Sequence, residues 1–132
     1  MHTGKSNMAR FRKRKIKWLR DVEERDYVAA ESYLGLLYRG KDVEKMIARL
    51  RKTSVVKFKA MDIFRASQLS LLGVSNSHVE KVRKKIRKGE SLSPLLLMRD
   101  AQLGKVVTAD GYHRLCAIYD FDEDALIRCR II

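Results

Sequence analysis

The chain has 132 residues, of which 45% are hydrophobic, so it is long enough for one domain with a buried core. Its formal net charge is +13, with 29 Lys and Arg against 16 Asp and Glu, which favours a polyanionic partner. No stretch approaches the roughly 18 apolar residues of a membrane span, and no apolar run follows the basic start as in a signal peptide.

The positive charge is concentrated in two segments. Lys5–Arg20 carries eight basic residues and no acid, and Ser77–Gly89 carries six basic residues and the single acid Glu80. These segments account for the whole net charge, so the remainder of the chain is formally neutral. We therefore expect nucleic acid to be bound through one arm and one helix. The predicted nucleic-acid contacts are Arg10, Arg12, Lys13, Arg14, Lys15, Lys17, Arg83, Lys84, Lys85, Arg87 and Lys88.

The N-terminal part predicts an arm followed by two helices. Residues 1–17 are expected to form a basic flexible arm, since charge repulsion there is not offset by an apolar face. Residues 18–52 predict a helical hairpin, with a helix over 18–39 ended by Gly40 and a second helix capped by Asp42. A helix-turn-helix DNA reader is one interpretation. A hairpin covering one face of a sheet is favoured, because the second helix is short and mixed in charge.

Residues 53–132 alternate between strand and helix patterns, which predicts a mixed α/β (α+β) domain: a small mixed sheet with flanking helices. The predicted elements are a strand in Ser54–Phe64 with a following turn or short helix, a helix opened by the capping box Ser77–Glu80 and ended by Gly89, a buried strand Leu95–Met98 after Pro94, a hairpin turn at Gly104, a strand Lys105–Thr108, a helix Tyr112–Asp120 and a last strand Ala125–Ile132.

The two cysteines, Cys116 and Cys129, lie inside a predicted helix and a predicted strand. They are typical of reduced core residues in a cytoplasmic protein, while a disulfide between them is a second interpretation. An Arg-rich, acid-free start is also found in organelle transit sequences. His113 and Cys116 have the spacing of two metal ligands on one helix, which Cys129 or His78 could complete. Because Cys116 is expected to point into the core, we predict no metal site.

The stretch from Asp110 to Arg114 is the best candidate for chemistry. It joins a strand to a helix, where unpaired N–H groups, the helix dipole and a guanidinium can converge on a phosphate. Asp110 is more typical of a helix cap than of a base, and Arg114 could instead pair with an acid such as Asp62, Asp110 or Asp120. We expect the start of the basic helix to face the same cleft. The predicted phosphate or nucleotide contacts are Gly111, Tyr112, His113, Arg114, Ser77, His78 and Lys81.

The order of these parts resembles the superfamily of ParB N-terminal domains and sulfiredoxins, over roughly residues 55–132. In that superfamily a Pro-containing strand is followed by a Gly-x-x-Arg motif opening a helix; the corresponding residues here are Pro94, Gly111 and Arg114. The resemblance implies phosphate contacts from Gly111 and Arg114 to a nucleotide such as ATP or CTP. Tyr112 stands at the position of the sulfiredoxin catalytic cysteine, so sulfiredoxin activity is not expected.

Three functions are compatible with these features. The first is a ParB-like protein of the cytoplasm that binds a nucleotide or nucleic-acid phosphate and associates with nucleic acid, alone or as a homodimer, without a membrane partner. The second is an enzyme of phosphate chemistry, a nucleotide hydrolase, kinase or nuclease. In it His113 or Asp110 is the candidate catalytic base, Arg114 stabilises the transferring phosphoryl group, and Mg²⁺ is the companion ion. The third is a non-catalytic protein-interaction module in which the motif only maintains the fold.

Overall fold

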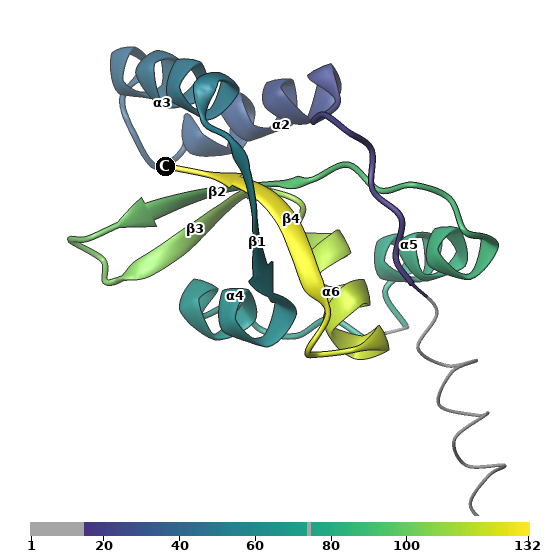
Figure 1. Ribbon diagram of the computed structural model, residues 1–132. Coiled ribbons are helices and arrows are strands. Elements are labelled where there is room, and N and C mark those ends of the chain that lie inside the picture. The colour runs from purple at the N-terminus through teal and green to yellow at the C-terminus, as the bar shows by residue number, and fades with distance from the viewer. Residues whose placement is uncertain (1–14, 74) are drawn as a thin grey trace, which may run out of the picture.

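The computed structural model describes residues 15–73 and 75–132, and it confirms the mixed α/β fold class. Helices lie on both faces of a four-stranded sheet with the order β1-β4-β2-β3 (Figure 1). β1 and β4 pair antiparallel, β2 and β3 form an antiparallel hairpin, and β2 runs parallel to β4. The elements are α2 (Glu24–Leu34), α3 (Gly40–Lys52), β1 (Val55–Lys59), α4 (Ala60–Ser67), α5 (Ser77–Lys88), β2 (Leu95–Asp100), β3 (Lys105–Asp110), α6 (Tyr112–Phe121) and β4 (Leu126–Ile131).

One face of the sheet packs against α2 and α3, the position expected for the helical pair (Figure 1). Alternate residues of β2 and β3 supply the sheet side of this contact, because successive side chains of a strand point to opposite faces. The buried members of this cluster are Val22, Tyr27, Ala30, Leu34, Val43, Ile47, Leu50, Leu96, Met98, Val107 and Ala109. The pairing of α2 and α3 is thus explained by burial of an apolar surface.

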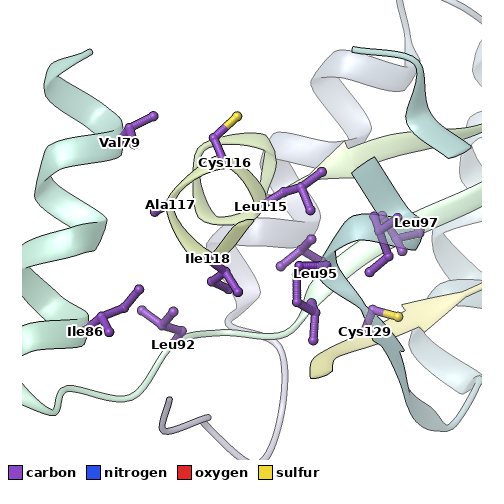
Figure 2. Packing of buried hydrophobic residues seen from close by; sticks show 13 residues of the cluster. Val79, Ile86, Leu92, Leu95, Leu97, Leu115, Cys116, Ala117, Ile118 and Cys129 are labelled. Carbon is purple, nitrogen blue, oxygen red and sulfur yellow. The ribbon is translucent and has the colours of Figure 1, made fainter. Parts of the chain in front are cut away.

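The other face packs against α4 and α6, and α5 packs on the outer side of α6 (Figure 2). Leu95, Leu97, Ile127 and Cys129 point from the sheet into this cluster, and each fully buried Leu or Ile contributes roughly 1.5–3 kcal/mol. Both cysteines are buried and free of a disulfide, which confirms the core interpretation. Burial raises the pKa of the Cys129 thiol to about 11, so its neutral form is favoured.

The first helix is shorter than predicted, and the expected range 18–39 is wrong at both ends. It begins at Glu24, because the chain before it runs beside the residues that precede β2: Trp18 forms a parallel bridge with Leu92. It ends at Leu34, and Gly40, expected as a helix stop, is instead the first residue of α3. Asp42 is therefore inside the first turn rather than a cap. The apolar pattern continued through the turn and masked the true boundaries.

The cap of α5 lies one residue earlier than predicted. The side chain of Asn76, and not Ser77, accepts hydrogen bonds from the N–H groups of His78 and Val79, at 3.0 and 3.1 Å. At the other end Gly89 has φ 74°, the left-handed conformation expected for a glycine that ends a helix. The basic helix is thus fixed at both ends.

Most of the predicted basic arm, residues 1–14, lies outside the described residues. Its last residues, 15–17, are described, and the carbonyl of Lys17 accepts a hydrogen bond of 2.8 Å from the N–H of Leu92. Among the described residues, no helix has the length and apolar character needed to cross a membrane.

Candidate functional site

A cleft of about 270 Å³ lies between the first turns of α5 and the start of α6. The two helices meet through Val79 and Ile86 of α5, which are buried against Ala117 and Ile118 of α6 (Figure 2). This packing brings the polar side of α5 next to the strand-to-helix junction predicted from the sequence. The residues lining the cleft are His78, Lys81, Val82, Lys85, Asp110, Gly111, Tyr112, His113 and Arg114.

The start of α6 is shaped by Gly111. Its φ of 108° is rarely adopted by residues with a side chain, and a Cβ built on it would lie 2.6 Å from Cγ of Leu95. The first helical hydrogen bond runs from the N–H of Leu115 to the carbonyl of Gly111, at 2.8 Å. The N–H groups of the first three helical residues therefore have no acceptor within the helix, as at any helix start. Close packing against Leu95 is sufficient to explain the glycine.

Asp110 does not cap α6, contrary to the sequence prediction. The N-cap residue is Gly111, and no side chain caps the helix. Asp110 instead accepts a hydrogen bond of 3.0 Å from Nη2 of Arg114, four residues later. The left-handed turn at Gly111 takes the place of a side-chain cap, so the carboxylate is available to the guanidinium.

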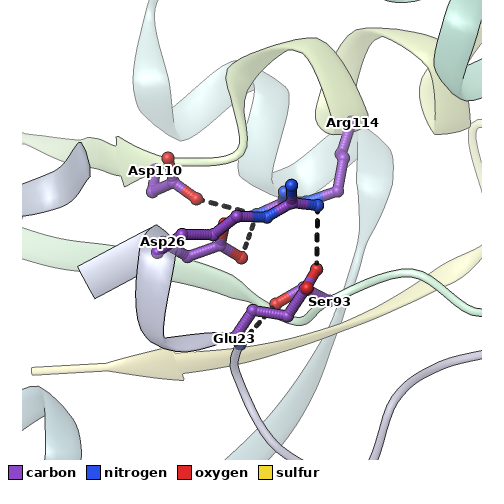
Figure 3. A network of polar contacts seen from close by, with 6 residues as sticks. Glu23, Asp26, Ser93, Asp110 and Arg114 are labelled. Atoms are coloured by element: carbon purple, nitrogen blue, oxygen red, sulfur yellow. Dashed lines mark hydrogen bonds and ion pairs between the residues drawn. The ribbon is translucent and has the colours of Figure 1, made fainter. Parts of the chain in front are cut away.

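Arg114 is held by two acids (Figure 3). Its Nη2 lies 3.0 Å from Oδ2 of Asp110 and 3.4 Å from Oδ2 of Asp26 on α2. The three side chains are only 9–17% exposed, so the ion pairs are poorly screened by water. Burial raises the pKa of the Asp110 carboxyl above its usual range; the nearby Asp26 raises it further, whereas Arg114 opposes the shift. The guanidinium predicted to bind phosphate is thus engaged inside the protein.

The segment before α2 places Asp26 beside this arginine. Ser93, just before β2, accepts a hydrogen bond of 3.1 Å from the N–H of Glu23, and this contact fixes the start of α2 (Figure 3). Asp26 follows in the first turn and is 6% exposed. The cluster therefore joins the N-terminal helical pair to the motif at the start of α6.

Two histidines face each other across the cleft. The ring centroids of His78 on α5 and His113 on α6 are 4.8 Å apart. Burial lowers the pKa of His113 below its usual value, and the charges of His78 and Arg114 lower it further. The imidazole of His113 is therefore mainly neutral at pH 7. Tyr112 lies beside it, and its hydroxyl donates a hydrogen bond to the carbonyl of Ser70.

The cleft contains most, but not all, of the predicted phosphate contacts. His78 and Lys81 line it together with Gly111–Arg114, whereas Ser77 does not. Lys85, predicted as a nucleic-acid contact, is a lining residue as well. The cleft therefore combines two exposed lysines and two imidazoles with the amide end of α6.

The predicted nucleic-acid contacts differ in how far they are already paired. Arg83 forms ion pairs with Glu80 and Asp120, and Arg87 pairs with Glu80. Lys84, Lys85 and Lys88 are exposed on α5. Lys15 and Lys17 line a different groove, next to β1 and β4. The remaining predicted contacts, Arg10, Arg12, Lys13 and Arg14, precede the described residues.

The alternative metal site is not assembled in the described ranges. Cys116 is fully buried in the hydrophobic cluster that includes α6. Across residues 15–73 and 75–132, no three His, Cys, Asp or Glu side chains are grouped to hold a metal ion. Asp26 and Asp110, the acids nearest the cleft, are both turned toward Arg114.

Asp26 is the site residue that sequence reasoning missed. It lies in the first turn of a helix beside Glu24, where acids are ordinary because they favour the helix dipole. Only its position next to the buried Tyr27 distinguishes it from its exposed neighbours, and that signal is weak.

Comparison of the chain with protein-family models, with curated proteins and with solved structures found no match.

Proposed function

We propose that this protein is a nucleic-acid-associated protein of the cytoplasm that holds a backbone phosphate in the cleft between α5 and α6. The observation that carries this proposal is the lining of the cleft, where Lys81, Lys85 and two imidazoles surround the amide end of α6. Helix N-termini and lysines are both common ligands of phosphate groups. The net charge of +13 supplies the long-range attraction for a polyanion.

The role of Arg114 in this proposal differs from that of the motif arginine in ParB-like proteins, which contacts phosphate. Because Asp26 and Asp110 already neutralise the guanidinium, the positive charges that meet the phosphate come from Lys81 and Lys85. Arg114 acts as a positioning residue that holds the start of α6 against α2. The resemblance to the ParB superfamily thus concerns the order of the elements more than the phosphate ligands themselves.

A nucleoside triphosphate with Mg²⁺ fits this cleft less well than a single phosphate. The volume of about 270 Å³ is below the roughly 300–1,000 Å³ of most ligand pockets. A Cβ built on Gly111 would meet Leu95 and Nη2 of Arg114, so the space on that side of the glycine is filled by the protein. Asp110, the acid lining the cleft, is bound to Arg114 rather than free to hold a metal ion.

The test is the salt dependence of nucleic-acid binding, measured by fluorescence anisotropy with labelled single strands and duplexes. Lys81→Gln with Lys85→Gln should lower the slope of log affinity against log salt by about 0.8, because the two lysines meet one phosphate and each neutralised phosphate contributes roughly 0.7–0.9. Lys41→Gln with Lys45→Gln on the exposed side of α3 removes the same charge elsewhere and is the matched control. Equal effects of the two pairs, or no binding by the native protein, would reject the site.

Calorimetric titration with ATP, CTP, GTP and ADP separates this proposal from a nucleotide pocket. Weak or absent binding of all four is expected. Tight binding of one nucleotide that is lost in Arg114→Ala would show that the ligand of the cleft is a nucleotide and not a nucleic-acid phosphate.

A second candidate function, phosphoester hydrolysis in the same cleft, is favoured by one observation. The depressed pKa of His113 leaves a neutral imidazole at pH 7, and such a group can accept a proton from an attacking water. Release of product from an oligonucleotide or nucleotide by the purified native protein, abolished in His113→Ala, would support it. Product release that survives this substitution would point to a contaminating enzyme.

A further inference from the structure

A second basic groove, of about 930 Å³, lies away from the cleft, between the segment before α2 and strands β1 and β4. Figure 1 shows that segment descending from α2 toward α5, and it runs beside Leu92, the residue bridged to Trp18. The groove also receives residues from the turn after α6. Among the described lining residues there are five bases and one acid: Lys15, Lys17, Arg20, Lys57, Arg128 and Asp122.

Two of these bases lie directly opposite each other on neighbouring strands of the sheet. Lys57 on β1 is the register partner of Arg128 on β4, and like charges in directly opposed positions destabilise a sheet. Within the described part of the chain neither forms an ion pair, and Nε of Arg128 is buried without a hydrogen-bond partner. Arg130, two residues further along β4, is by contrast paired with Asp21 and donates a hydrogen bond to the carbonyl of Thr53. The sheet therefore carries a pair of cations that the described protein leaves uncompensated.

We propose that this groove binds the phosphodiester backbone of nucleic acid and forms a second contact site for the ligand held at the α5–α6 cleft. The inference rests on the proposed nucleic-acid function. A phosphate between Lys57 and Arg128 replaces their mutual repulsion by two attractive contacts, since charge-assisted hydrogen bonds to phosphate are stronger than neutral ones.

The two sites are connected along α5. His78, near its start, lines the cleft; Gly89, which ends it, lies beside Lys17 of the groove, whose Nζ is 3.6 Å from the position of a Cβ on that glycine. His78 and Gly89 are 11 positions apart, which along a helix is about 16 Å, or roughly five nucleotides of a stacked strand at 3.4 Å each. Lys84 and Lys88 are exposed on the helix between them. A strand that keeps this stacked spacing must be about five nucleotides long to contact both sites.

The experiment compares two charge-neutralising pairs in the full-length protein. Lys57→Gln with Arg128→Gln removes the cation pair, and Lys45→Gln with Arg49→Gln removes one Lys and one Arg from the exposed side of α3. Anisotropy is measured with labelled 20-nucleotide single strands, 20-base-pair duplexes and poly-glutamate of matched length. Melting temperatures of all variants show whether the fold is kept, and Lys57→Gln alone is the variant used if the double change unfolds the protein.

The groove variant is expected to lower the salt slope by about 0.8 and to weaken binding about sixfold at 0.1 M salt, while the α3 control stays within about twofold of native. A larger effect on single strands than on duplexes, or the reverse, identifies which form of nucleic acid supplies the backbone. Native-like binding by the groove variant overturns the groove and leaves the cleft standing. Poly-glutamate bound as tightly, with the same loss in the variant, overturns the assignment to nucleic acid. Absence of any binding by the native protein overturns both proposals.

Discussion

Nη2 of Arg114 lies 3.4 Å from Oδ2 of Asp26, a contact that connects the first turn of α6 to the first turn of α2. Asp110 shares the same nitrogen at 3.0 Å. Through this arginine the N-terminal helical pair is bound to the motif that the sequence singles out. The arginine therefore contributes to cohesion of the fold, and its substitution tests that role separately from any ligand.

We predict that Arg114→Ala lowers the free energy of unfolding by about 3–5 kcal/mol, because it leaves two buried carboxylates without their counter-charge. Urea unfolding followed by circular dichroism measures the loss. Arg25→Ala removes the exposed pair with Glu23 and should cost less than about 1 kcal/mol. If the two variants were equally stable, Arg114 would have no structural role beyond that of a surface pair.

Gly111→Ala is expected to destabilise the protein by roughly 2 kcal/mol, because the new Cβ meets Leu95 at 2.6 Å and the backbone has a φ of 108°. Gly40→Ala is the matched control, since nothing lies within 4 Å of its Cβ position. At this helical position alanine should be neutral or stabilising, by up to about 1 kcal/mol. Thermal unfolding of both variants checks the contrast. Equal melting temperatures would show that Leu95 can move aside.

Asn76→Ala should cost about 1 kcal/mol, because it removes the side-chain oxygen that accepts the N–H groups of His78 and Val79. Ser77→Ala, one residue later, should leave the free energy of unfolding nearly unchanged. Both are measured by urea unfolding. The reverse order of effects would restore Ser77 as the cap.

The pKa of His113 should rise in His78→Gln, because the substitution removes one of the positive charges that depress it, although burial remains the larger cause. NMR titration of the imidazole C–H signals gives the pKa directly. The folded value lies below the ordinary 6.5, so the unfolded chain binds more protons between the two values. Stability contributed by neutral His113 is therefore present above pH 6.5 and lost as the pH falls through the folded pKa. A His113 pKa unchanged in the variant would contradict the coupling across the cleft.

Deletion of residues 1–14 should weaken nucleic-acid binding and reduce its salt slope, because five basic residues are removed. A protein with the same segment replaced by Gly and Ser controls for length. The measurement is anisotropy over a salt series. Affinity equal to that of the native chain would show that the arm is not a contact, without affecting the predictions for the groove or the cleft.

Much of the sheet could be predicted from the sequence, because its strands carry short apolar runs bounded by clear turn residues. Leu95–Met98, Gly104 and the start of α6 all lie where the pattern places them. The first helix could not be bounded in this way. Its apolar spacing continues into a turn, and its start depends on a distant contact between Trp18 and Leu92.

The site was predictable in its location but less so in its electrostatics. The structure has a cleft at the strand-to-helix junction where Gly111, His113 and Arg114 lie, and phosphate binding in it stays a prediction. Whether Arg114 faces a ligand or an acid depends on which residues the tertiary fold brings beside it, and Asp26 comes from a helix far away in the chain. The groove at Lys57 and Arg128 was missed for the same reason, since the two bases become neighbours only through the pairing of β1 with β4.

That pairing also constrains how the protein can fold during its synthesis. β4 lies between β1 and β2, although it is the last of the four strands to be made. The hairpin of β2 and β3 can form from neighbouring residues, whereas β1 has no strand to pair with until Leu126–Ile131 has left the ribosome. Until then the edge of β1, with Val56 and Phe58, is unpaired and exposed. A nascent chain paused before β4 therefore presents a strand edge that chaperones can bind and that can pair with other chains in an aggregate.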